Sequence, residues 1–178
     1  MISDAVWRRA CPAGQVLDLL HARVTEPYAP HVHEEYAVGV CTAGREVIRY
    51  RGTLHYAGPG SVVVLEPGEA HTGAPADPPA FTYRVMYPAA GLLSDGMWRT
   101  PRFREPVIAD PGLAAELRRL HAALGLGAQS LEAQPLDAES RWFRRVVGST
   151  RASTATAFKT APHGMGDADL VRRMTRMR

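Results

Sequence analysis

Cysteine is scarce in this 178-residue chain, which has only Cys11 and Cys41, too few for a disulfide framework. No run of about eighteen apolar residues occurs, which excludes a membrane-spanning helix. The first nine residues lack the charged and then apolar layout of a secretory signal peptide. Together these absences predict a reduced protein of the cytoplasm without a membrane partner.

An excess of positive charge is also absent from the first 150 residues. Residues 151–178 hold six basic and two acidic residues, which leaves 15 basic and 16 acidic residues in the first 150. A broad DNA-binding face requires a cluster of Lys and Arg side chains. The sequence therefore argues against such a face on the folded core.

Several signatures of enzyme chemistry are absent as well. The chain has no glycine loop that would cradle a phosphate, no Cys-x-x-Cys pair, and no Ser, His and Asp arrangement typical of a nucleophile. The chemistry of any site must therefore come from other residues.

Short strands bounded by glycine or proline turns dominate the first hundred residues. Runs rich in apolar, β-branched and aromatic residues predict strands at 17–24, 36–42, 46–51, 54–56, 61–65 and 81–87. Residues 1–12 are interpreted as an irregular lead-in. No helical pattern separates the strands before about residue 110, which argues against a parallel α/β fold. We expect a mainly β fold over residues 1–108, a small antiparallel β-barrel or jelly roll.

The apolar period changes after residue 108, and two amphipathic helices are predicted within residues 109–147. Asp110 is a suitable N-cap followed by proline, and Gly125 ends the first helix. Leucines spaced four, three and four residues apart form one stripe on this helix: Leu113, Leu117, Leu120 and Leu124. The stripe either covers the barrel or forms the two-fold interface of a homodimer. The second helix is predicted over 136–147.

The last part of the chain has a different composition. Residues 148–178 are first rich in small and polar residues and then basic, which predicts a flexible linker and the truncated start of a basic helix.

Three histidines lie in β-type surroundings. His31 and His33 are two residues apart and point to the same face of a strand, and His71 follows a Pro-Gly turn. If the strands fold back as hairpins, the three imidazoles meet inside the barrel. Such a group suits Zn²⁺, Ni²⁺ or Fe²⁺. The alternatives are a metal-free polar pocket and purely structural histidines.

A family resemblance rests on the histidine pair, the strand at 61–65, the Pro-Gly-Glu-x-His turn that ends at His71, and the strand at 83–87. These segments resemble the effector-binding domain of AraC-type transcriptional regulators over about residues 15–147. The resemblance implies a cupin barrel, dimerisation helices, and a C-terminal domain with two helix-turn-helix units. No helix-turn-helix pair is present here. We therefore expect a sensor fragment that reaches DNA only through a C-terminal domain missing from this chain.

The resemblance also assigns roles to individual residues. His31, His33 and His71 also resemble the histidines of the general cupin metal motifs. This resemblance implies that they are metal ligands, with Glu35 or water as the fourth ligand. Ligand contacts are expected from the strand after the turn, hence from Tyr83 and Tyr87, with Tyr36 and Arg49 as further candidates.

The sequence thus predicts a domain that binds a small-molecule effector, with no enzymatic activity. The alternative is a stand-alone metal-dependent cupin enzyme, such as a dioxygenase or an isomerase.

Overall fold

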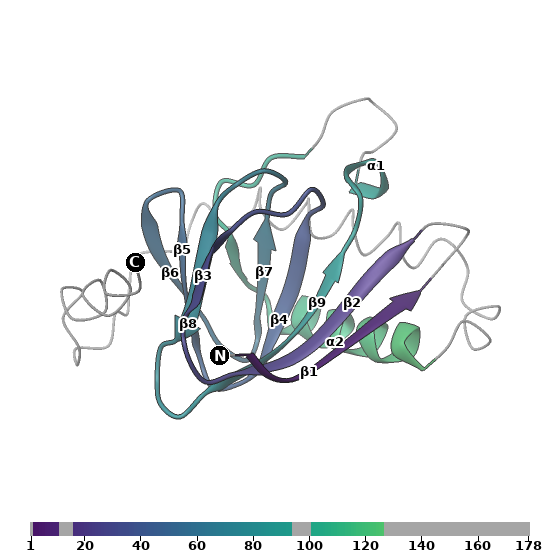
Figure 1. Ribbon diagram of the computed structural model, residues 1–178. Coiled ribbons are helices and arrows are strands. Elements are labelled where there is room, and N and C mark those ends of the chain that lie inside the picture. The colour runs from purple at the N-terminus through teal and green to yellow at the C-terminus, as the bar shows by residue number, and fades with distance from the viewer. Residues whose placement is uncertain (1, 11–15, 94–100, 127–178) are drawn as a thin grey trace.

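The structure, a computed structural model, describes residues 2–10, 16–93 and 101–126 (Figure 1). Within these ranges the chain forms strands and two helices. In chain order they are β1 (Ile2–Ala10), β2 (Leu17–Val24), β3 (Tyr28–His31), β4 (Ala37–Ala43), β5 (Glu46–Tyr50), β6 (Thr53–Ala57), β7 (Ser61–Leu65), β8 (His71–Pro75), β9 (Phe81–Tyr87), α1 (Ala90–Leu93), β10 (Val107–Ala109) and α2 (Pro111–Gly125).

The larger sheet has six antiparallel strands in the order β1-β2-β9-β4-β7-β10. Its central strands are the apolar runs that the sequence predicts as strands, which confirms that part of the interpretation. The prediction of an irregular lead-in over residues 1–12 is wrong, because β1 pairs with β2 along its length. The first residues are therefore an edge strand of the main sheet.

The smaller sheet has four antiparallel strands in the order β3-β8-β5-β6. A tight turn joins β5 to β6. Arg51 and Gly52 at this turn both have positive φ values, 49° and 79°, the conformation that two-residue hairpin turns require. The turn also places the Arg51 guanidinium 2.8 Å from the carboxylates of Glu66 and Glu69.

The two sheets pack face to face, and among the described strands no pairing joins them into a closed barrel. Ile48 and Tyr50 of the smaller sheet lie in one buried cluster with Val63, Leu65 and Val85 of the larger sheet. The expected antiparallel β architecture is confirmed, and closure of the barrel is not observed.

Helix α2 covers the outer face of the larger sheet (Figure 1). It begins as predicted, with the Asp110 side chain accepting a hydrogen bond of 2.9 Å from the Leu113 amide. Leu113, Leu117 and Leu124 are buried against the sheet, and Leu120 packs at the edge of the same cluster. Of the two uses predicted for the leucine stripe, covering the strands is therefore the one observed. The homodimer interface predicted for these leucines stays a prediction.

Two predicted segments lie outside the described residues. They are the second helix at 136–147 and the linker with the basic segment at 148–178. Neither helix in the described ranges is long and apolar enough to span a membrane.

Candidate functional site

A cavity of about 320 Å³ lies between the two sheets. Both sheets contribute to its walls, which are mainly apolar and aromatic. The polar or aromatic side chains that line it are those of Trp7, Tyr28, His31, His33, Glu46, His71, Tyr83 and Tyr87. The volume is at the lower end of the range for small-molecule pockets.

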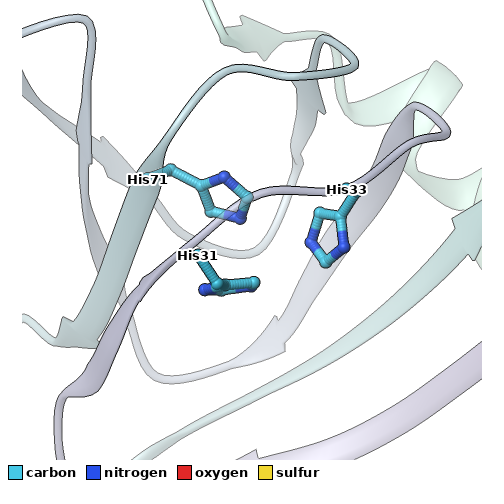
Figure 2. Close-up of side chains that lie close together, drawn as sticks. All are labelled: His31, His33 and His71. Atoms are coloured by element: carbon cyan, nitrogen blue, oxygen red, sulfur yellow. The ribbon is translucent and has the colours of Figure 1, made fainter.

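The three predicted histidines meet at this cavity. One ring nitrogen from each of His31, His33 and His71 lies within 4.8 Å of the others. The ring centroids are 4.3 to 5.0 Å apart, and Figure 2 shows the three rings gathered around one space. His31 and His71 face each other across the β3–β8 pair. The pairing of these two strands thus brings together residues that are forty positions apart in the sequence.

Hydrogen bonds fix which nitrogen two of these histidines can offer. The Nδ1 atom of His71 lies 3.1 Å from the Glu69 carbonyl oxygen, and Nδ1 of His31 lies 3.1 Å from that of Ala29. A carbonyl only accepts, so each Nδ1 carries the proton and leaves the Nε2 lone pair free. Backbone carbonyls orient metal-binding histidines in this way in many proteins.

The loop that carries His33 is also held in place. The Gly68 amide donates a 2.8 Å hydrogen bond to the His33 carbonyl, which ties the Pro-Gly turn to the histidine loop. Burial lowers the pKa of His71 to about 4 and also lowers the pKa of His33, so both rings are neutral near pH 7. Neutral imidazole is the form that binds metal ions. The donor set therefore fits a divalent transition metal.

The other predicted site residues are distributed differently. Tyr83 and Tyr87 line the cavity, and Glu35 lies outside the group of three histidines. Tyr36 is buried in the opposite core, where its hydroxyl donates to the Pro101 carbonyl, and Arg49 is exposed on β5. The structure thus brings the three histidines and two tyrosines together at the cavity. Tyr36 and Arg49 lie away from the cavity, and Glu35 is outside the group of three histidines.

Three cavity residues were not anticipated from the sequence. Trp7 belongs to the stretch interpreted as an irregular lead-in, and its ring stacks on Tyr87 with centroids 5.6 Å apart. Tyr28 lies in a proline-punctuated segment, and its ring meets His31 edge-on at 5.3 Å. Glu46 begins a strand whose alternation suggested one polar face. The neighbouring Glu46, Val47 and Ile48 are all buried, so alternation alone could not identify the carboxyl as internal.

Glu46 is a buried acid, with 6% of its surface exposed. The Tyr28 hydroxyl donates a 2.8 Å hydrogen bond to its Oε1 atom. Burial raises the Glu46 pKa to about 7, and the Tyr28 hydrogen bond opposes this rise. Gly73 leaves room for the pair, because a Cβ atom there would overlap both the Tyr28 hydroxyl and the Glu46 carboxylate.

Comparison with known proteins gives one specific match. The sequence profile of the family described as "AraC-like ligand binding domain" matches residues 15–145. No curated protein is significantly similar in sequence to the chain.

Several similar solved structures are named as cupins, at low similarity. A cupin 2 conserved barrel domain protein from Salinispora arenicola is 22% identical with a TM-score of 0.40, over 49% of this chain and 78% of that one. A cupin-2 domain containing protein from Shewanella frigidimarina is 16% identical with a TM-score of 0.37, over 40% and 70%. An oxalate decarboxylase from Lactobacillus farciminis is 16% identical with a TM-score of 0.41, over 48% and 31%. These scores are too low to carry an argument about activity.

Proposed function

The chain belongs to the AraC-like ligand binding domain family, and on that premise we propose that it senses a small-molecule effector for an AraC-type transcription regulator. The observation that carries this proposal is the cavity between the sheets, where three histidines meet aromatic side chains. The effector would bind there, and its binding would alter how an attached DNA-binding domain is held. Such control requires the effector to bind two states of the protein with different affinities.

A metal ion bound by the three histidines would help the cavity to bind an effector. His31, His33 and His71 would hold one Zn²⁺, Ni²⁺ or Fe²⁺ ion, because their ring nitrogens lie close together and backbone carbonyls orient His31 and His71. A bound ion would supply a Lewis acid that binds an oxygen or nitrogen atom of the effector. Glu35 was predicted as a fourth ligand, but it lies outside the group. Effector or water would therefore complete the coordination.

Helix α2 is the element through which ligand binding at the cavity would affect the rest of the domain. His121 on this helix is buried, and its Nε2 atom lies 3.0 Å from the carbonyl oxygen of Leu20, a cavity residue on β2. Its Nδ1 atom accepts a 3.2 Å hydrogen bond from Arg84 on β9, between the cavity residues Tyr83 and Val85. A ligand that displaces β2 or β9 would thus change the contacts of α2.

Ligand binding can be tested through Trp7, which lines the cavity and stacks on Tyr87. We expect an effector to change the tryptophan fluorescence of the chain and to raise its unfolding temperature. The fluorescence change should be lost in Trp7→Phe, and the thermal shift should remain. An operator-binding measurement then tests control: unchanged operator affinity of the complete regulator at saturating effector would contradict the sensing role.

The same histidines also suit a metal-dependent cupin enzyme, a dioxygenase or an isomerase, which is the second candidate. The family match favours the sensor. Stoichiometric iron or nickel together with turnover, both lost in His33→Ala, would favour the enzyme instead. A sensor is expected to bind its effector and release it unchanged.

A further inference from the structure

The cavity has a second polar region, formed by the Glu46 carboxyl and the Tyr28 hydroxyl, which we call the polar corner. Glu46 lines the cavity and is almost fully buried. The structure gives it one side-chain hydrogen bond, from Tyr28 to Oε1. Among the side chains that the structure describes, at residues 5–7, 16–91 and 101–126, no Arg, Lys or His forms an ion pair with Glu46. Its Oε2 atom is therefore available to a molecule in the cavity.

Aromatic side chains line the same cavity as this carboxyl. The Glu46 charge raises the pKa values of Tyr28, Tyr83 and Tyr87, after the larger effect of burial, so it acts on three tyrosines from two strands. Trp7 stacks on Tyr87 at an interplanar angle of 24° and extends the aromatic wall. The faces of such rings attract cations.

The charges around the corner favour a positive ligand. A buried carboxylate is costly unless a cation or hydrogen-bond donors accompany it, and the one donor found here, Tyr28, is already used. An anionic group placed next to Glu46 would be repelled by the carboxylate charge. A protonated amine would meet a carboxylate and aromatic faces.

We propose that the cavity takes a small molecule whose apolar or aromatic body lies among the tyrosines and whose protonated amine pairs with Glu46. This inference rests on the proposed ligand-sensing function and adds the chemical class of the effector. A metal ion held by the histidine group would bind an oxygen or nitrogen atom elsewhere on the same molecule, because the Tyr28 ring lies between His31 and the polar corner.

Three probes of one shape test the charge preference: 2-phenylethylamine, 2-phenylethanol and phenylacetate. Their affinities for the 178-residue chain would be measured by titration calorimetry above the Glu46 pKa of about 7, with and without a metal chelator. We expect the amine to bind most tightly, and chelation to leave its affinity intact. In Glu46→Gln the amine affinity should fall on the order of tenfold or more, while the alcohol affinity stays the same.

Glu105→Gln is the matched control, because it removes a carboxylate that is 54% exposed and does not line the cavity. It should leave all three affinities unchanged. The amine-to-alcohol ratio of the unaltered protein needs no variant, so a poorly folding Glu46→Gln protein does not remove the test. Tighter binding of the alcohol or phenylacetate would overturn the amine assignment and leave the ligand-sensing cavity standing. Failure of all three probes to bind or to raise the unfolding temperature would count against both the amine assignment and the ligand-sensing function.

Discussion

Replacing Leu117 with alanine gives a direct test of how the leucine stripe is used. The Leu117 side chain is 0% exposed and lies in the core cluster that joins α2 to the larger sheet, together with Val38 and Met86. If the stripe covers the sheet, the substitution opens a cavity inside one chain. If the stripe were a two-fold interface, the same substitution would instead weaken association between two chains.

The size of the effect follows from complete burial. A leucine-to-alanine change at a fully buried site costs about 3–5 kcal/mol, because the removed methyl and methylene groups leave a cavity that closes only in part. Helix α2 lies on the outer face of the sheet and can settle toward it, so we expect the lower end, about 3 kcal/mol. For a chain of this size that corresponds to a decrease of roughly 6–12 °C in unfolding temperature.

The assay is thermal unfolding followed by circular dichroism over a wide range of protein concentrations. We expect a decrease in the unfolding temperature that is the same at every concentration, with no change in molar mass by light scattering. Leu126→Ala is the control, because Leu126 ends the same helix and is 86% exposed; its unfolding temperature should be nearly unchanged. A Leu117→Ala protein of unchanged stability but smaller molar mass would refute the covering role.

Three further outcomes are expected. An excess of Ni²⁺ or Zn²⁺ of about 100 times its dissociation constant should stabilise the chain by about 2.7 kcal/mol in thermal unfolding; His33→Ala should abolish this gain and His55→Ala, outside the histidine group, should keep it. Burial lowers the pKa of His121 to about 4. Between about pH 4 and 6.5 the unfolded chain therefore binds more protons than the folded chain. The free energy of unfolding should decrease as the pH falls through that range, by up to about 3 kcal/mol. In His121→Gln, urea unfolding should show a shallower pH dependence, and an unchanged slope would contradict this role. Glu66→Gln should cost about 2 kcal/mol in urea unfolding, because the buried Glu66 carboxylate accepts hydrogen bonds from Arg102 and the Phe103 amide; Glu69→Gln, at a partly exposed carboxylate, should cost much less, and equal losses would contradict the distinction.

Much of the fold follows from the sequence because its strong signals are local. The β-branched run at Ser61–Leu65 forms β7, and the Asp110-Pro111 pair starts α2 where the capping pattern predicts. Strand β1 was missed because its residues carry no clear alternation. What makes them a strand is pairing with β2, which depends on a neighbour and not on their own propensity.

The site divides in the same way. His31, His33 and His71 could be grouped from spacing and turn chemistry, because the side-chain direction on a strand is set by the backbone. The buried acid could not, since three consecutive residues from Glu46 onward are buried and no alternation separates inside from outside. Tyr36 is an aromatic residue beside the histidine loop and was predicted to contact the ligand. It lies instead on the other face of the sheet, in the core beneath α2.

Gly73 gives the ligand domain a position at which its recognition chemistry can change during evolution. A single methyl group at this position would displace the Tyr28 hydroxyl and the Glu46 carboxylate together, although residue 73 itself need not touch the effector. A family member with a larger residue at this position would need a different arrangement of residues 28 and 46 in that part of the cavity.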